Sequence, residues 1–226
     1  GRTPVDGGEI DGSAGEDWVK SAVEELESLP NVRLRLRCMG AGVYDHGFVL
    51  GYERLRDHRP DLPGPRHRLW KIRATRVIAA TGAIERPLAF PGNDLPGVML
   101  ASAVRDYVVN HAVAPGRRTV IVTNNDDAYR TALALHAAGL TVAAILDARP
   151  EGGGALMAAC RDKGIRVDLD AAILSVKGGR QVEGVTVARQ SGRPEPAETI
   201  RCDAVAMSGG WSPVVHLWSH CGGKLL

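Results

Sequence analysis

The sequence has few aromatic residues and no long apolar run. Only 4% of its 226 residues are Phe, Trp or Tyr. No stretch approaches the roughly 18 consecutive apolar residues of a membrane-spanning helix. The first residues, Gly1-Arg2-Thr3-Pro4, lack the apolar core of a secretory signal. These absences exclude a membrane partner, and we expect a cytoplasmic protein.

Cysteine is also scarce, and its spacing excludes several kinds of site. No two of the four cysteines form a C-x-x-C pair, which argues against a disulfide framework, a structural zinc site and a dithiol redox centre. We expect buried thiols in a reducing compartment and no metal site. The four residues are Cys38, Cys160, Cys202 and Cys221.

Charge of one sign does not dominate the composition. The 28 Lys and Arg residues balance 26 Asp and Glu residues to a formal net charge of +2, which implies neither a nucleic-acid nor a membrane partner. A hydrophobic share of 44% and a charged share of 24% are typical of a globular protein with one large domain or two small ones. The sequence does not begin with Met, and we expect it to be a piece of a longer chain.

One layout of predicted strands occurs twice, about 130 residues apart, which is the length of a domain and not of a solenoid repeat. Each copy opens with a strand, at Asn31–Leu36 and at Gly164–Leu169, and continues as a meander. Each closes with an apolar strand that ends in a hydroxyl residue and glycine, at Val77–Gly82 and at Ala204–Gly209. The alternating stretches between them predict antiparallel strands over 48–55, 69–72, 182–188 and 199–202.

Only the second copy contains a complete β-α-β unit. Thr119–Val122 and Thr141–Leu146 are apolar runs typical of buried parallel strands. Between them, Tyr129–Ala138 has helical spacing and Gly139 is a helix stop. The unit has about 29 residues, the size of a mononucleotide-binding half. We expect the corresponding unit of the first copy to precede Gly1.

A segment rich in proline and glycine separates the two copies. Three turns between Arg86 and Gly97 make a stiff connector typical of a domain boundary. The apolar residues within Val98–His111 then follow one face of a helix. Two lobes follow from this arrangement.

Several motifs carry a resemblance to a known family. A strand ending in Ala-Thr-Gly, and its counterpart ending in Ser-Gly-Gly, resemble the flavoprotein disulfide reductase superfamily, whose chains hold two dinucleotide-binding domains, the second inserted into the first. More closely, eight motifs in order are similar to the alpha subunits of heterotetrameric sarcosine oxidase. These motifs lie at 11–18, 29–33, 44–46, 80–87, 96–100, 123–126, 147–150 and 208–213.

The resemblance implies an α/β fold of the FAD/NAD(P)-binding type, with two Rossmann-type lobes of sheet, helices and meander in three layers. The first lobe is expected to be incomplete. The predicted parts are an incomplete first dinucleotide-binding lobe at 1–97, a connecting helix and linker at 98–115, an inserted second Rossmann-like lobe at 116–207 and a return segment to the first lobe at 208–226.

The resemblance also implies an oxidoreductase that demethylates sarcosine to glycine, passes formaldehyde to tetrahydrofolate and releases hydrogen peroxide. It implies NAD in the first lobe of the intact subunit, FMN at a subunit interface and FAD in a partner subunit. The partners would be the other subunits of the heterotetramer. This chain would be a scaffold portion with no catalytic residue, inactive alone, and whether it binds a nucleotide by itself stays open.

The second lobe has a poor glycine fingerprint. A dinucleotide loop needs glycine at its first two positions and glycine or alanine at the third. Thr123, Asn125 and Ala128 occupy these positions, and only Ala128 fits. Asp126 and Asp127 would also lie at the helix N-terminus, where they repel a pyrophosphate. We therefore expect a lobe kept as scaffold.

Dinucleotide binding by this lobe remains the alternative. Asp147 follows the next strand at the place of an acid that binds ribose, although an acid after a strand is common. In this alternative Thr123, Asn125 and Asp147 contact the cofactor.

The two turn motifs are further candidates for cofactor contact. Thr81 and Gly82 would end a parallel strand of the first lobe, where such sheets bind ligands, although a plain turn also fits. In the second lobe, glycines allow close backbone approach and a tryptophan offers a flat face to a ring or to a subunit. Packing explains this second turn equally well. It consists of Ser208, Gly209, Gly210 and Trp211.

Three weaker signals have simple structural explanations. His216, His220 and Cys221 share a helical face, but no further ligand cluster supports a metal there. Tyr44-Asp45-His46 fits an acid–base group or a structural cap before a strand, and we expect the cap. The basic stretch over 54–76 is interrupted by acids and indicates the solvent face of a meander, not a nucleic-acid site.

Two other functions fit the same residues. One is a noncatalytic module that docks a flavoprotein partner. The other is a subunit of a related amine or opine dehydrogenase with the same two-lobe plan.

Overall fold

The computed structural model describes residues 8–191 and 198–224, which form two compact units. Unit 1 comprises Gly1–Glu9 and Glu85–Ser212, and unit 2 comprises Ile10–Ile84 and Pro213–Leu226. The main segment of unit 1, Glu85–Ser212, therefore lies in the sequence between the two segments of unit 2. The lobe boundaries expected from the sequence differ from these unit boundaries and stay a prediction.

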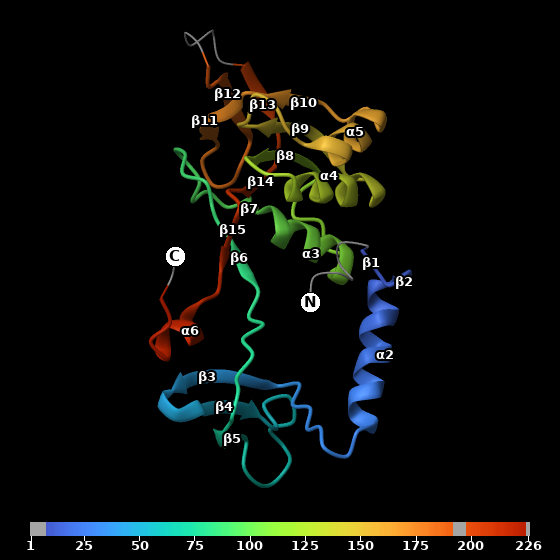
Figure 1. The fold of residues 1–226 in the computed structure, drawn as a ribbon. Helices are drawn as coiled ribbons and strands as arrows, with labels where there is room; N and C mark the ends of the chain where they lie inside the picture. The colour runs from blue at the N-terminus through green and yellow to red at the C-terminus, as the bar shows by residue number, and fades with distance from the viewer. Residues whose placement is uncertain (1–7, 192–197, 225–226) are drawn as a thin grey trace. The chain divides into compact units, whose positions relative to one another are not determined.

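Unit 1 is built on a five-stranded sheet with the strand order β10-β9-β8-β14-β7, in which all neighbours are parallel. Figure 1 shows its helices on one side of the sheet and an antiparallel meander on the other. The sheet strands are β7 (Val98–Leu100), β8 (Arg118–Thr123), β9 (Thr141–Asp147), β10 (Val167–Leu169) and β14 (Ala204–Ser208). The helices are α3 (Ala101–His111), α4 (Asp127–Ala137) and α5 (Gly154–Asp162), and the meander is β11 (Ala171–Lys177), β12 (Gly184–Arg189) and β13 (Glu198–Arg201).

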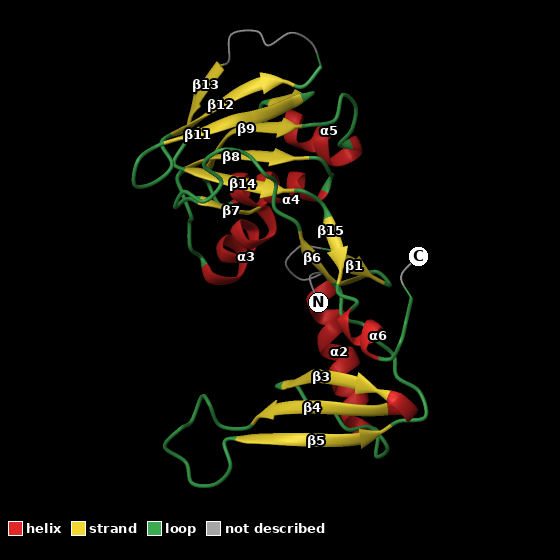
Figure 2. Cartoon of the chain, turned by 90° about the vertical axis from the view of Figure 1, so that its left-hand side faces the viewer, coloured by secondary structure: helices red, strands yellow, loops and turns green. Residues whose placement is uncertain are grey.

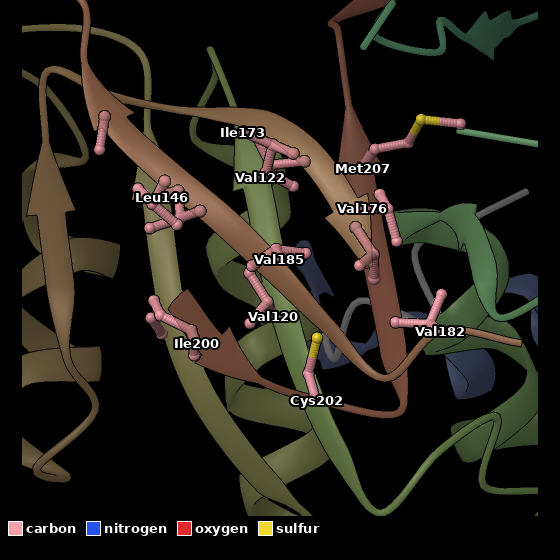
Figure 3. Close-up of a cluster of buried hydrophobic side chains, with 14 residues drawn as sticks. Val120, Val122, Leu146, Ile173, Val176, Val182, Val185, Ile200, Cys202 and Met207 are labelled. Atoms are coloured by element: carbon pink, nitrogen blue, oxygen red, sulfur yellow. The ribbon is translucent and has the colours of Figure 1, made fainter. Parts of the chain in front are cut away.

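Alternation along the parallel strands explains the three layers. Successive side chains of a strand point to opposite faces, and a parallel sheet covered on both faces needs apolar residues at every position. In β8, Val120 and Val122 belong to the cluster on the meander side, whereas Ile121 belongs to the cluster on the helix side. In Figure 3 the side chains of Val122 and Ile173 lie together in the meander-side cluster. The run of Val-Ile-Val thus joins both cores.

Unit 2 contains a three-stranded antiparallel sheet in the order β3-β4-β5 and a long helix, α2, which are visible in Figure 2. Its elements are β2 (Ser13–Ala14), α2 (Gly15–Ser28), β3 (Cys38–Tyr44), the 3₁₀ turn η1 (Asp45–Gly47), β4 (Phe48–Arg54), β5 (His67–Arg73) and α6 (His216–His220). Two further two-stranded sheets join β1 (Glu9–Ile10) to β2 and β6 (Ala83–Glu85) to β15 (Trp211–Pro213).

The turn between β3 and β4 requires glycine. Gly47 has φ +66°, and a Cβ atom there would lie 2.0 Å from the carbonyl oxygen of Ala74. The preceding residue, His46, is also left-handed at φ 59°. These residues give Tyr44-Asp45-His46 a structural role at the hairpin turn.

Apolar burial differs sharply between the units. Val43 is the one apolar side chain buried in the described part of unit 2, whereas unit 1 contains two extensive clusters. Ile78 is 92% exposed, Leu36 79% and Met39 60%. Because hydrophobic burial is the main favourable term in folding, unit 2 contributes little stability of its own.

Most predicted elements of the second lobe are confirmed. The strands expected over 119–122, 141–146 and 204–208 are β8, β9 and β14, and the helix expected over 129–138 is α4. The predicted helix over 98–111 is wrong in its first three residues, which pair with β14 as β7.

Two predicted strands of the first lobe are wrong. Asn31–Leu36 and Val77–Gly82 have no strand structure. A strand requires a hydrogen-bonded neighbour, and no segment within 8–191 or 198–224 pairs with either stretch. Alternation at Asn31–Leu36 and an apolar run at Val77–Gly82 were therefore not sufficient to predict strands.

The cysteines are all free thiols, as their spacing predicted. Cys160 and Cys202 are buried, Cys38 is partly buried, and Cys221 is exposed, so the expectation of burial is wrong for Cys221. Burial raises the pKa of Cys160 and of Cys202 to about 11 in each case. In the described parts of the chain, no helix is long and apolar enough to cross a membrane.

We expect backbone amides of β4 in unit 2 to exchange with deuterium at least about tenfold faster than those of β8 in unit 1. Exchange from β8 requires opening of two apolar clusters, whereas β4 has little buried surface to hold it closed. Hydrogen exchange measured by mass spectrometry on the full chain tests this. Equal protection of both strands would contradict the contrast in burial.

The buried thiols predict a pH dependence of stability. An ordinary thiol ionises near pH 9, and the folded chain raises this value to about 11 at Cys160 and Cys202. Their contribution is therefore fully present below pH 9 and is lost as the pH rises through 11. Urea titrations of the Cys160→Ala/Cys202→Ala variant should show a shallower loss of unfolding free energy over this range. The Cys221→Ala control should keep the slope of the unmodified chain, and an equal slope in all three proteins would refute the assignment.

Candidate functional site

Three residues singled out from the sequence meet at the carboxyl ends of the parallel strands in unit 1. Thr123, Asp147 and Ser208 end β8, β9 and β14, and Thr123 is in register with both of the others. All three are fully buried. We call this region the strand-end edge, formed by Thr123–Asp127, Asp147–Arg149 and Ser208–Trp211. Parallel α/β sheets bind ligands at such an edge.

The Asn125 side chain fills the loop between β8 and α4. Its Nδ2 donates to the Ser208 Oγ at 2.9 Å and to the Ser208 carbonyl at 3.2 Å. Its Oδ1 accepts from the Asp127 N–H at 3.1 Å, which caps the start of α4. Thr123 Oγ1 donates to the Asn125 carbonyl at 2.9 Å and accepts from the Asn125 N–H at 3.0 Å. The loop is thus held by its own side chains.

Asp147 lies at the centre of a buried polar network. Its Oδ2 accepts from the Tyr129 hydroxyl at 2.8 Å and from Arg149 Nη2 at 2.7 Å. Its Oδ1 accepts from the Arg149 N–H and from Arg149 Nε, both at 3.0 Å. The hydrogen bonds to Asp147 raise the pKa of the Arg149 guanidinium. Burial, and then the bond to Asp147, raise the pKa of Tyr129.

Asp126 belongs to the same network. Its Oδ1 accepts from Arg149 Nη2 at 2.6 Å and from the Gly153 N–H at 3.1 Å. Arg149 therefore bridges the acid at the end of β9 and the acid before α4. The sequence reasoning missed Arg149 and Tyr129, although the arginine stands two residues after a strand-ending acid.

Asp127 has a different partner. Arg105 of α3 is 1% exposed, and its Nη2 donates to both carboxylate oxygens of Asp127, at 3.0 and 3.2 Å. Arg105 Nη1 also donates to the Asp127 carbonyl at 3.1 Å. This buried pair joins α3 to the start of α4, so Asp127 has a structural role that the sequence did not indicate.

Backbone packing explains the two glycines after Ser208. The Gly209 N–H donates to the Arg86 carbonyl, and the Arg86 N–H donates to the Gly210 carbonyl, both at 2.8 Å. A Cβ atom on Gly209 would lie 2.9 Å from the Pro87 carbonyl oxygen, and Gly210 has φ +91°. The close approach expected at this turn is therefore to the chain itself. Trp211, the next residue, is half-buried in β15.

Thr81 and Gly82 belong to unit 2 and do not end a strand. The Thr81 hydroxyl donates to the Val214 carbonyl at 2.5 Å, and the Gly82 carbonyl accepts from the Val214 N–H at 2.9 Å. Gly82 has φ +71° and open space around its Cα atom. The pair forms an exposed turn against the return segment, and the described residues of unit 2 offer no strand–glycine loop–helix cradle for a pyrophosphate.

The histidines of α6 do not form a metal site with Cys221. The Cys221 thiol donates to the carbonyls of Leu217 and Trp218, at 3.6 and 3.2 Å. The His220 ring stacks on Tyr44, with 6.3 Å between ring centroids. Across residues 8–191 and 198–224, no group of three or more His, Cys, Asp or Glu side chains could hold a metal ion.

The geometry also tests whether a dinucleotide fits the second lobe. A ribose needs free acceptors on the acid after β9, and a pyrophosphate needs free amides at the start of α4. Asp147 and the Asp127 N–H are already occupied by Arg149, Tyr129 and Asn125. The residues present therefore do not fit a dinucleotide in this arrangement.

Comparison with known proteins gives a consistent picture. The chain is 43% identical over 217 residues to the sarcosine oxidase subunit alpha of Rhizobium meliloti (strain 1021), covering 95% of this chain and 21% of that protein. It is 36% identical over 233 residues to the same subunit of Corynebacterium sp. (strain P-1), covering 97% of this chain and 23% of that protein. No protein-family model matches the chain. This chain spans about a fifth of the length of the two sarcosine oxidase subunits.

A solved structure supports the fold. The crystal structure of T. acidophilum thioredoxin reductase has a TM-score of 0.68 at 15% identity, covering 94% of this chain and 64% of that chain. The predicted α/β fold of the FAD/NAD(P)-binding type is confirmed.

We expect Asp127→Asn to lower the free energy of unfolding by about 3 kcal/mol, because it removes the charged carboxylate to which the buried Arg105 guanidinium donates two hydrogen bonds. Asp106→Asn is the matched control on α3, since Asp106 is exposed and bonds to Asn110 at the surface. It should change stability by less than about 0.5 kcal/mol. Urea denaturation measures both values, and equal losses in the two variants would contradict a structural role for the buried pair.

Proposed function

We propose that this chain, which is homologous to the alpha subunits of sarcosine oxidase along nearly its whole length, is the nucleotide-cofactor portion of such a subunit. The homology is the observation that carries the proposal. In the complete enzyme, sarcosine, oxygen and water yield glycine, formaldehyde and hydrogen peroxide, and the formaldehyde passes to tetrahydrofolate.

In this proposal the chain is scaffold and not catalyst. The polar side chains of the strand-end edge in unit 1 form hydrogen bonds with one another. The buried thiols have raised pKa values, which disfavours the reactive thiolate. Both observations support a chain without catalytic residues.

The cofactors of the complete enzyme are assigned by homology. NAD belongs to the first lobe of the complete subunit, where Thr81 and Gly82 would contribute an exposed turn, although the described residues of unit 2 form no pyrophosphate cradle by themselves. FMN belongs to a subunit interface and FAD to a partner subunit. NAD would be the nucleotide held in the first lobe. The turn at Ser208–Trp211 would have a structural role, because its backbone bonds to that of Arg86.

The partners are the other subunits of a heterotetramer. Unit 2 supports this assignment, because its described part buries Val43 alone among apolar side chains and exposes Leu36, Met39 and Ile78. Exposed apolar side chains of this extent are typical of surfaces that pack against other protein. The same observation favours a second candidate function, a noncatalytic module that docks a flavoprotein partner.

The test compares the chain alone with the assembly. We expect the purified chain to release no hydrogen peroxide from sarcosine and oxygen. The gene that encodes it, expressed with its genomic neighbours, should yield a complex that releases peroxide and formaldehyde from sarcosine. Peroxide release by the chain alone at the rate of the complex would contradict the scaffold role.

Substrate comparison within the same experiment separates the alternatives. A complex that oxidises an opine or another secondary amine but not sarcosine would favour a dehydrogenase of related plan. A complex that assembles but retains full activity when this chain is omitted would favour a docking module.

A further inference from the structure

The acceptor capacity of Asp147 is fully used inside unit 1. A carboxylate has about four lone-pair sites. Asp147 accepts four hydrogen bonds, one from the Tyr129 hydroxyl and three from the backbone and side chain of Arg149, at 2.7–3.0 Å. The residue is 0% exposed. No acceptor remains for the hydroxyls of a ribose.

Arg149 also extends this closure to the neighbouring loops. Its Nη2 donates to Asp126 at 2.6 Å, and Asp126 in turn accepts from the Gly153 N–H before α5. The backbone of the glycine loop lies against the guanidinium, since a Cβ atom on Gly152 would be 2.6–2.8 Å from its atoms. One side chain thus connects the end of β9, the start of α4 and the loop before α5.

Charge makes this arrangement difficult for a nucleotide to displace. Arg149 brings a positive charge to two carboxylates, and charge-assisted hydrogen bonds are roughly twice as strong as neutral ones. A ribose would offer neutral hydroxyls to the same acid. Its pyrophosphate would also bring negative charge close to Asp126 and Asp127.

We propose that Arg149 is an internal latch that replaces the ribose of a dinucleotide at Asp147 and holds the second lobe closed to dinucleotides. The Asn125 side chain completes the closure by taking the Asp127 N–H at the start of α4, where a pyrophosphate would bind. This inference rests on unit 1 alone and does not depend on the proposed function.

NADH titration of the full chain tests the latch. The unmodified chain should show no saturable change in NADH fluorescence up to 1 mM nucleotide, which is the order of a weak site. Arg149→Ala should show saturable binding, and Arg149→Ala/Asn125→Gly should bind at least about tenfold more tightly. NADH should also raise the melting temperature of these two variants only.

Arg166→Ala is the matched control, because Arg166 likewise pairs with two carboxylates, Asp168 and Glu198, in unit 1 but away from the strand-end edge. It should behave as the unmodified chain does. Arg149→Gln provides a second variant, since it keeps a neutral donor beside Asp147 if the alanine variant does not fold. It should also gain NADH binding.

Two results would overturn the proposal. One is saturable NADH binding by the unmodified chain that Asp147→Asn abolishes. The other is a folded Arg149→Gln or Arg149→Ala/Asn125→Gly variant that binds NADH no better than Arg166→Ala.

Discussion

Burial of side chains on both faces of the five-stranded parallel sheet is the interaction on which unit 1 depends. Val120, Ile121 and Val122 alternate between a cluster under the meander and a cluster under the helices, so one short strand takes part in both cores. A buried sheet of this kind holds the ends of its strands in fixed register. The strand-end edge, with Thr123, Asp147 and Ser208 side by side, is a result of that register.

The hydrogen bonds among the polar side chains of this edge then determine whether the lobe can bind a ligand there. Buried charged groups such as Asp147 and Arg105 need partners, because an unpaired buried charge is costly. In this chain Arg149 and Tyr129 donate to Asp147, and Asp127 accepts from Arg105, so these partners come from the lobe itself. The polar side chains of this edge thus bond mainly to one another, which agrees with the scaffold role proposed above.

The sequence predicted the strands of the second lobe and the meander strands of the first lobe, now β4 and β5, but it failed at Asn31–Leu36 and Val77–Gly82 for a physical reason. The strands of the second lobe have their hydrogen-bonded neighbours within the chain, so apolar runs such as Thr119–Val122 become strands. Val77–Gly82 has the same pattern but no described neighbour, and it forms no strand. At the strand-end edge, the poor glycine fingerprint was readable from Thr123 and Asn125. The contacts of the Arg149 guanidinium could not be predicted from the sequence, because they depend on distances between three separate loops.

The position of β14 has a consequence for the order in which the chain assembles. β14 lies between β7 and β8 in the sheet, although it is the last of the five strands along the sequence. Until Ala204–Ser208 leave the ribosome, β7 has no partner strand and the edge of β8 that faces away from β9 is unpaired. Such non-local pairing slows folding, because distant residues must meet before either strand is held. The newly made chain therefore exposes an unfilled gap in its sheet until these residues have been made, and it is in that interval that a chaperone would have the most to bind.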